Sequence, residues 1–247
     1  YPSLDVRPYF KRNYLYGETM THILGYVGRI NDRDVERLKK EEKFANYSGS
    51  TDMGKLGIER YYEEQLHGTT GFEEVEINNR GKVIRKLREQ PATAGKSIHL
   101  TIDLALQRYI MSLLSGQKGA VVVLDPKDNS VLAMVSTPSY DNNLFVDGIS
   151  ASDYKRLLND PARPLYSRAT QGVYPPASTV KPFVAVAALT EGVITPHTTI
   201  FDPGYWMLPN STKRFRDWKK SGHGYTDLNK AITESSDTFF YQTAFNL

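Results

Sequence analysis

Apolar residues recur along this chain at different spacings, and each spacing predicts a different kind of element. Residues 32–41 and 56–68 predict helices, and Gly68 is suited to end the second one. Residues 72–85 alternate in polarity on both sides of an Asn-Asn-Arg-Gly turn, which predicts a β-hairpin. These elements form a packing module whose charges face solvent, and the aromatic pair Tyr9-Phe10 is interpreted as part of its core.

The pattern changes near residue 100, where strands and a helix are predicted close together. Residues 100–103 are interpreted as a short strand ending at Asp103, an N-cap residue for the helix that follows. Strands at 119–125 and 131–136, joined by a Pro-Lys-Asp-Asn turn, predict an antiparallel hairpin. The apolar side of the helix predicted at residues 104–114 consists of Leu106, Ile110, Leu113 and Leu114.

Small residues, Pro and Gly at positions 90–96 indicate a boundary between two parts of the chain. This boundary divides the chain into predicted domains at residues 1–95 and 96–247. Residues 139–172 are interpreted as a long polar connection, after which helices gather. Helices that follow strands in this way are typical of an α+β fold.

A turn at Pro175-Pro176 leads into Ser178 and a run of helix formers that ends at Gly192. If Ser178 begins this helix, Lys181 lies one turn further along the same face. The arrangement places a hydroxyl, an amine and the positive end of a helix dipole together. Serine needs a base beside it to act as a nucleophile, and a lysine can be that base only in its neutral form, which burial favours.

The pattern Ser-x-x-Lys occurs three times, and its context separates the copies. Ser115–Lys118 falls at the end of a predicted helix. Ser152–Lys155 falls in a polar stretch that is typical of a solvated surface. Only Ser178–Lys181 combines a preceding turn with an apolar helical run, residues 183–189, that could be buried. We therefore expect Ser178 to be the nucleophile.

Composition limits the class of protein. The chain has 247 residues, of which 24% are charged, and its net charge of +3 is too small to indicate a nucleic-acid partner. It contains no cysteine, which excludes disulfides and thiol chemistry. The sequence shows neither a signal peptide nor an apolar run long enough to span a membrane. We interpret it as part of a longer protein.

A second group of polar residues lies at positions 235–237, just before an aromatic helical run. Ser235 and Asp237 are residue types that often cap helices, and a cap is the simpler interpretation when the segment is taken alone. Beside Ser178 and Lys181, however, the hydroxyl of Ser235 gains a role as a proton relay.

These motifs resemble those of penicillin-binding proteins, in which Ser-x-x-Lys is followed by Ser-Asp-Asn and Lys-Thr-Gly. The resemblance extends over Gly57-Ile-Glu59-x-x-Tyr62, residues 171–182 and Arg216-Asp-Trp-Lys, and so over nearly the whole chain. It is closest to the class B members that act in cell elongation in Gram-negative bacteria. The resemblance implies an α+β fold, with a penicillin-binding/β-lactamase-like transpeptidase domain, truncated at its C-terminus, after a smaller N-terminal pedestal or dimerisation-type module.

The resemblance also implies a D,D-transpeptidase that cross-links peptidoglycan stem peptides through a serine acyl-enzyme. Ser178 would be the nucleophile, Lys181 the base and Ser235 the relay, and Asp237 would complete the second motif. The expected partners are stem peptides, β-lactam antibiotics, a membrane glycosyltransferase and other proteins of the elongation machinery, and no nucleic acid. The expected location is the periplasmic face of the inner membrane, with a single-span anchor upstream of this chain.

Two features depart from the general pattern. Asp237 stands where the motif has Asn, and an ionised carboxylate near Lys181 favours the charged amine, against its role as a base. The elongation subgroup is known to carry Asp here, so the assignment is kept. Lys220-Ser221-Gly222 fits the third motif only as text, because it precedes the second motif and lies in a Gly-rich loop. We expect the true third element beyond Leu247.

Asp202, Asp217 and His223 form a third set between the two motifs. Taken without the resemblance, His223 between two glycines is a loop histidine. Members of the family resemble one another in a zinc site of two Asp, one His and one Cys, and the Cys position falls at Ser236, a poor zinc ligand. The resemblance implies no required cofactor, and a zinc ion at Asp202, Asp217 and His223 stays an open alternative.

Two other functions stay open. One is a hydrolytic relative, a D,D-carboxypeptidase or β-lactamase that gives the acyl group to water, and carboxypeptidase chemistry is also expected as a side activity of the transpeptidase. The N-terminal module argues against the hydrolytic relatives. The other is a non-catalytic penicillin-sensing or scaffold module, which would be acylated by penicillin without turning over a stem peptide.

Overall fold

Two units make up the chain in a computed structural model that describes residues 11–247. Contacts between Cα atoms divide the chain into Tyr1–Gly172 and Val173–Leu247. The predicted core pair Tyr9-Phe10 lies outside the described residues. Within the part that the structure describes, the longest apolar helices are too short to cross a membrane.

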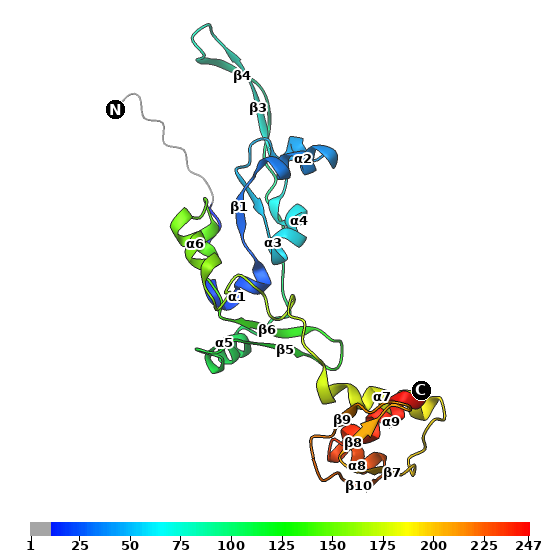
Figure 1. The fold of residues 1–247 in the computed structure, drawn as a ribbon. Helices are drawn as coiled ribbons and strands as arrows, with labels where there is room; N and C mark the ends of the chain where they lie inside the picture. Colours follow the sequence, from blue (N-terminus) through cyan, green and yellow to red (C-terminus); the bar gives the residue numbers. More distant parts are fainter. Residues whose placement is uncertain (1–10) are drawn as a thin grey trace. The chain divides into compact units, whose positions relative to one another are not determined.

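The first unit alternates helices with short strands (Figure 1). Its elements are α1 Gly17–Leu24, β1 Val27–Arg29, α2 Asp32–Lys40, a 3-10 turn Phe44–Tyr47, β2 Asp52–Gly54, α3 Gly57–Tyr61, α4 Glu63–His67, β3 Phe72–Ile77, β4 Val83–Gln90, α5 Leu104–Leu113, β5 Gly119–Leu124, β6 Val131–Thr137, a second 3-10 turn Asn142–Phe145 and α6 Ala151–Asn159. The strands form two-stranded antiparallel sheets, in which β1 pairs with β2, β3 with β4 and β5 with β6.

The helix predicted at residues 32–41 is present as α2, and a reciprocal cap explains where it begins. The Asn31 side chain accepts a hydrogen bond from Asp34 N–H at 3.0 Å, and the Asp34 carboxylate accepts one from Asn31 N–H at 3.1 Å. Lys55 and Arg37 form ion pairs with the same carboxylate. Burial alone would raise the pKa of Asp34, but these hydrogen bonds and charges outweigh it and hold the pKa below its ordinary value.

Two elements predicted at residues 56–68 and 72–85 are present with changed bounds. The helix is broken into α3 and α4 at Tyr62, and Gly68 ends the second piece, as predicted, with a φ of 76°. The hairpin is formed by β3 and β4, and its second strand runs on to Gln90.

The motif at the start of α3 is fixed by a close backbone contact. Gly57 has a φ of +59°, and a Cβ added there would lie 2.5 Å from the carbonyl oxygen of Ile23, at the end of α1. Two residues later, Glu59 is buried, and its carboxylate lies 2.9 Å from the guanidinium of Arg12. The Gly57-Ile-Glu59 motif therefore ties α3 to α1 and to the residues before α1.

The prediction of a strand at residues 100–103 is wrong, because these residues form no regular strand. This segment is bonded to β6 through Asp103 N–H and the carbonyl of Leu132, at 2.9 Å, without forming a regular ladder. Further along β6, the buried side chain of Gln107 bonds the N–H of Met134 at 2.8 Å and its carbonyl at 2.9 Å. A side chain from α5 thus takes the position that another strand would occupy.

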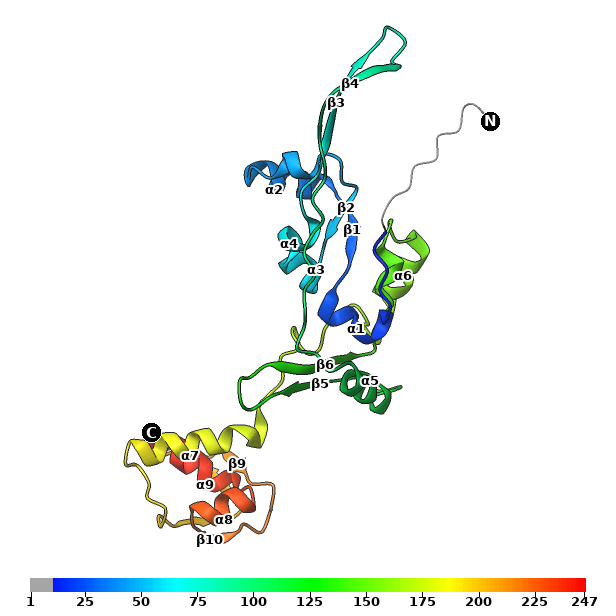
Figure 2. The same ribbon diagram turned by 180° about the vertical axis from the view of Figure 1, so that it is seen from behind.

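The elements around the β5–β6 hairpin are mostly as predicted. The Asp103 carboxylate caps α5, and α5 packs beside β6 (Figure 2). Leu113, predicted on the apolar side of α5, is instead 58% exposed, and Met111 packs against the hairpin core. The polar connection predicted at residues 139–172 contains α6, which Ser150 caps.

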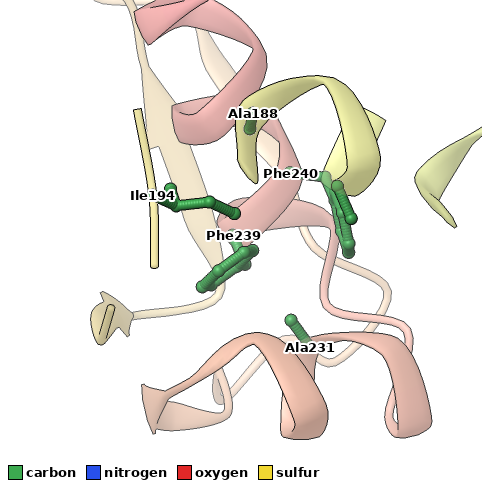
Figure 3. Packing of buried hydrophobic residues seen from close by; sticks show 6 residues of the cluster. Ala188, Ile194, Ala231, Phe239 and Phe240 are labelled. Carbon is green, nitrogen blue, oxygen red and sulfur yellow. The ribbon is translucent and has the colours of Figure 1, made fainter. Parts of the chain in front are cut away.

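The second unit holds the Ser-x-x-Lys motif that the sequence favours. Its elements are a 3-10 turn Ala177–Val180, α7 Lys181–Thr190, β7 Ile200–Asp202, β8 Tyr205–Met207, β9 Arg214–Arg216, β10 Gly224–Thr226, α8 Leu228–Thr233 and α9 Asp237–Asn246. The strand β7 pairs with β10, and β8 pairs with β9, both antiparallel. Figure 3 shows its core, in which α7, α8 and α9 meet around Ala185, Ala188, Ile194, Ala231, Phe239 and Phe240.

The apolar run of α7 is buried on one side only. Ala185 and Ala188 face the core, and their small side chains allow α7 to pack closely on α9. Phe183 is 75% exposed and Val186 is 64% exposed. The burial expected for the whole run, residues 183–189, therefore holds for one face of the helix.

Candidate active site

Ser178 and Lys181 lie at the start of α7. Ser178 belongs to the preceding 3-10 turn, and Lys181 is the first residue of the α-helix. Pro182 follows at a position where helical N–H groups have no intrahelical partner, so it does not break the helix. Ser178 is exposed, whereas Lys181 is buried. A substrate can reach the hydroxyl, while the amine is shielded from water.

Ser235 links the hydroxyl of Ser178 to the amine of Lys181. Its Oγ lies 3.0 Å from Ser178 Oγ and 3.1 Å from Lys181 Nζ. Lys181 Nζ also donates to the carbonyl oxygen of Ser235 at 2.7 Å and to Asp237 Oδ1 at 2.6 Å. The structure thus brings together the four residues that the sequence singles out, although 57 positions separate Ser178 from Ser235.

In the turn between α8 and α9, the side chains of the neighbouring residues Ser235 and Ser236 point in different directions. Ser235 has a φ of +55°, a left-handed conformation that costs free energy for a residue other than Gly. Its hydroxyl bonds Ser178, whereas the hydroxyl of Ser236 is buried and caps α9 by accepting from Phe239 N–H at 3.2 Å. Asp237 then begins α9 with its side chain directed at Lys181. The helix cap considered for this segment is therefore made by Ser236.

Trp218 is a residue of the site that sequence reasoning did not single out. Its backbone N–H donates to Asp237 Oδ2 at 3.3 Å, and its indole N–H donates to the carbonyl of Glu234 at 3.0 Å. Trp218 therefore holds the carboxylate on the side away from Lys181. The only signal in the sequence is its place inside the quoted stretch Arg216-Asp-Trp-Lys.

The other two Ser-x-x-Lys pairs have different surroundings. Ser115 and Lys118 are exposed after α5, and Lys118 Nζ donates to the carbonyl of Pro161 at 3.4 Å. Ser152–Lys155 lies on α6 with both side chains exposed. Lys220-Ser221-Gly222 forms a turn and no strand, which agrees with its treatment as a chance match.

Asp202, Asp217 and His223 meet in the interior of the second unit, where the pairing of Gly224 with Asp202 brings β7 and β10 together. Oxygen and nitrogen atoms of the three side chains lie within 4.8 Å of one another. His223 Nδ1 is 2.6 Å from Asp202 Oδ2 and 3.6 Å from Asp217 Oδ1. Ser236 completes the group, with Oγ 3.0 Å from Asp202 Oδ2 and 3.3 Å from Asp217 Oδ2.

Hydrogen bonds keep one of these buried carboxylates ionised. Burial alone would raise the pKa of Asp202, but donors outweigh it and lower the pKa to about 2. The hydrogen bonds come from His223, the N–H of Gly204 and the hydroxyl of Ser236. The three predicted residues and Ser236 are therefore brought together in one buried cluster.

Comparison with known proteins assigns the chain to a family. The model of the penicillin binding protein transpeptidase domain matches residues 119–247, and the model of the penicillin-binding protein dimerisation domain matches residues 1–100. The chain belongs to the penicillin-binding protein transpeptidase family. The predicted family is thus confirmed.

Curated members of this penicillin-binding protein family are very similar to the chain. The peptidoglycan D,D-transpeptidase MrdA of Haemophilus influenzae is 85% identical over 247 residues, which are 100% of this chain and 38% of the relative. The MrdA protein of Escherichia coli is 62% identical over 247 residues, 100% of this chain and 39% of the relative. The chain therefore spans well under half of these relatives.

Solved structures of penicillin-binding proteins share the fold. PBP2 of Pseudomonas aeruginosa in complex with WCK 5153 has a TM-score of 0.81 and 45% identity, over 98% of this chain and 49% of the other. PBP2 of Helicobacter pylori in complex with MreC has a TM-score of 0.85 and 34% identity, over 96% of this chain and 43% of the other. The α+β fold class, with a transpeptidase domain after a dimerisation domain, is confirmed.

The penicillin-binding protein domains and the two contact units divide the chain at different positions. The dimerisation model ends at residue 100, the transpeptidase model begins at residue 119, and the contact division falls after Gly172. Residues 119–172 therefore match the transpeptidase domain while they pack in the first unit. The boundary between residues 95 and 96 stays a prediction.

Proposed function

We propose that this chain carries the nucleophile of a peptidoglycan D,D-transpeptidase. The observation behind the proposal is the hydrogen-bonded series from Ser178 through Ser235 to Lys181, whose first member is exposed and whose last is buried. A serine with a relay and an amine behind it is an arrangement that can activate the hydroxyl for acyl transfer. The MrdA relatives support a stem peptide that ends in D-Ala-D-Ala as the acyl donor.

Acylation begins when Ser178 Oγ attacks the carbonyl carbon of the penultimate D-alanine. The Ser178 proton passes to Ser235 Oγ while Ser235 gives its own proton to the neutral amine of Lys181. The peptide C–N bond then breaks, and the proton returns through Ser235 to the leaving nitrogen, so that D-alanine departs as an amine. The N–H of Ser178 supplies half of an oxyanion hole, which contributes roughly 3 kcal/mol per donor.

Asp237 and Trp218 set the direction of the amine in this mechanism. Asp237 Oδ1 is 2.6 Å from Lys181 Nζ, and Trp218 N–H holds the other carboxylate oxygen. The pair orients Nζ toward Ser235, whose Oγ lies 3.1 Å from it. The carboxylate therefore holds the amine in place beside Ser235.

The acyl-enzyme is resolved by an amine of a second stem peptide, which forms the new peptide bond and frees Ser178. Water in place of that amine gives carboxypeptidase side activity. A β-lactam presents a strained amide to Ser178, and its leaving nitrogen stays tethered to the acyl group, so release is slow. PBP2 of Pseudomonas aeruginosa forms a complex with WCK 5153, which supports the proposal that a protein of this fold can bind a small-molecule ligand.

The partners and location of the whole protein follow from the same reasoning. The Helicobacter pylori relative forms a complex with MreC, which supports a partner in the elongation machinery. A membrane glycosyltransferase would supply the glycan strands that carry the stem peptides. These substrates lie outside the cytoplasm, which supports the periplasmic face of the inner membrane as the location.

Labelled penicillin tests the nucleophile in the full-length protein. We expect stoichiometric label on Ser178, loss of label in Ser178→Ala, and full label in Ser115→Ala and Ser152→Ala, since these two serines lie outside the site. Label on Ser115 or Ser152 in the unchanged protein contradicts the assignment.

Turnover separates the proposed transpeptidase from its alternatives. With a stem peptide and an amine acceptor, a transpeptidase forms a cross-linked product, whereas a hydrolytic relative releases mainly the free acid. A penicillin-sensing or scaffold module is acylated by penicillin but releases no D-alanine from the stem peptide. Mass spectrometry of the products distinguishes the three, and a cross-linked product that requires Ser178 supports the proposal.

A further inference from the structure

The cluster of Asp202, Asp217, His223 and Ser236 has the donors it needs without a metal ion. Ser236 is fully buried, and its Oγ accepts from Phe239 N–H while its proton is directed at Asp202 Oδ2. A neutral hydroxyl is a poor zinc ligand, and a structural zinc site has four protein ligands. The donor set here offers three.

The carboxylate oxygens of the cluster are satisfied by hydrogen bonds from the protein. Asp202 Oδ1 accepts from Gly204 N–H at 2.7 Å, and Oδ2 is bonded by His223 and Ser236. Asp217 Oδ1 accepts from Lys219 N–H at 3.1 Å. Buried carboxylates require such donors or a cation.

The second Asp217 oxygen connects the cluster to the start of α9. Asp217 Oδ2 accepts from Thr238 N–H at 2.9 Å, in the first turn of α9. The next residue, Trp218, gives its N–H to Asp237 Oδ2. One loop segment therefore holds both the first turn of α9 and the carboxylate that meets Lys181.

One atom of the cluster points elsewhere. His223 Nε2 is buried and has no hydrogen-bond partner among the described residues, and Glu234 Oε2 lies 3.8 Å from it. The other ring nitrogen, Nδ1, is the one that bonds Asp202. The orphaned nitrogen therefore gives a metal ion no additional ligand inside the cluster.

We propose that Asp202, Asp217, His223 and Ser236 form a metal-free brace, held by the Ser236 hydroxyl, that positions Asp237 against Lys181. Asp202 and His223 anchor the brace to β7 and to the residue before β10, and Ser236 and Asp217 fix the start of α9. These four are positioning residues, because they act on the reaction through Asp237. The part of the proposal that concerns Lys181 rests on the proposed function, whereas the metal-free part does not.

Metal content tests the first half of the proposal on the full-length protein, purified from zinc-supplemented cells without chelator. We expect fewer than about 0.1 zinc ions per chain, because the fourth ligand is missing. We also expect EDTA to leave the Tm unchanged. About one zinc ion per chain, with a Tm that falls in EDTA, overturns the metal-free brace.

A thiol at position 236 tests whether the hydroxyl is what excludes the metal. Ser236→Cys is expected to bind about one zinc ion per chain, since a thiolate completes a four-ligand set. Its Tm is then expected to fall when EDTA removes the zinc. Ser136→Cys, which puts a thiol at another buried serine, is expected to bind none. Absence of zinc from Ser236→Cys contradicts the role given to the hydroxyl.

The second half is tested by the kinetics of penicillin acylation. Ser236→Ala removes the donor, and we expect the acylation rate constant at saturation to fall about tenfold or more, because misplacement at the reacting groups costs rate. The half-saturating penicillin concentration should stay within about twofold, since Ser236 does not reach the surface. Zinc-loaded Ser236→Cys should recover most of the lost rate.

Ile194→Val is the matched control, because it removes one buried methylene from the same unit without touching the brace. If Ile194→Val loses as much acylation rate as Ser236→Ala at equal Tm, the brace has only a general structural role and the positioning claim is overturned. If the unchanged protein is not acylated at Ser178, the proposed function fails, while the metal measurements still decide whether the brace is metal-free.

Discussion

At the residue scale, the site depends on a serine whose backbone is strained. Ser235 has a φ of +55°, and Ala177, the neighbour of the nucleophile, has a φ of +49°. Two left-handed residues of this kind are costly, and they persist only where the surrounding contacts determine them. One of the two strained residues is Ser235 and the other precedes Ser178, and the hydroxyls of these two serines lie 3.0 Å apart.

The Ser235 hydroxyl is expected to be essential for acylation. Ser235→Ala keeps the backbone conformation available but removes the atom between Ser178 and Lys181, so we expect the penicillin acylation rate to fall by about 100-fold or more. The Tm should change little, because the hydroxyl is exposed on its Ser178 side. Stopped-flow acylation of the full-length protein measures the effect, and an unchanged rate would show that Lys181 reaches Ser178 without the relay.

The sequence predicts the chemistry of single residues better than their directions. Ser178 stands out from Ser115 and Ser152 because a turn precedes it and an apolar helix follows, which are local signals. The direction of the Asp237 side chain is not a local property. An Asp at this position could either cap the helix or pair with Lys181, and the neighbouring sequence is the same in both cases. Contact between residues 56 positions apart decides it.

At the element scale, local signals predicted the starts of α2 and α5 but missed α6, which Ser150 caps. The cap at Asp103 depends only on residues in the first turn of the helix that follows, and it is present as predicted. A strand needs a partner, and the predicted strand at residues 100–103 loses its partner edge to the side chain of Gln107. No pattern within that segment could reveal that a glutamine from the next helix bonds Met134.

Acid sensitivity of the first unit is expected to come partly from α2. The pKa of Asp34 is lowered in the folded chain, so its ionised form contributes stability that is present above the unfolded value of about 3.9 and is lost as the pH falls through the folded value. Asp34→Asn should cost about 2 kcal/mol at pH 7, since it removes the charge from a partly buried ion pair with Lys55, while the amide oxygen can still accept from Asn31 N–H. It should lose less stability than the unchanged protein between pH 5 and pH 3.

Thermal unfolding followed by circular dichroism at several pH values measures this difference. Asp32→Asn is the control, because it removes the same charge from an exposed position in the first turn of the same helix. If Asp32→Asn reduces the acid sensitivity as much as Asp34→Asn does, the general charge of the helix end is responsible and the specific pair with Lys55 is not.

At the scale of the whole molecule, the two units bury their apolar residues in separate clusters. The clusters around Leu38, Ile110 and Tyr140 belong to the first unit, and the cluster around Phe239 belongs to the second. Both tryptophans, Trp206 and Trp218, lie in the second unit. Tryptophan fluorescence therefore reports on the unit that carries the candidate active site.

The outer face of α7 carries a row of exposed apolar side chains. Phe183, Val186 and Leu189 recur every third residue on that helix, and Phe183 and Val186 are 75% and 64% exposed. Contiguous exposed apolar residues usually mark a surface that another part of a protein covers. The MrdA relatives, of which this chain spans 38–39%, have ample further sequence to do so.

We therefore expect a protein limited to residues 1–247 to bind the dye ANS, and the full-length protein to bind little. Val186→Ser in the limited protein should lower the dye signal, because it breaks the apolar stripe in the middle. Val173→Ser, at a residue that is 93% exposed outside the helix, should not. Equal dye binding by the limited and full-length proteins would show that the face of α7 remains open, and that its apolar residues serve a partner or a substrate instead of the fold.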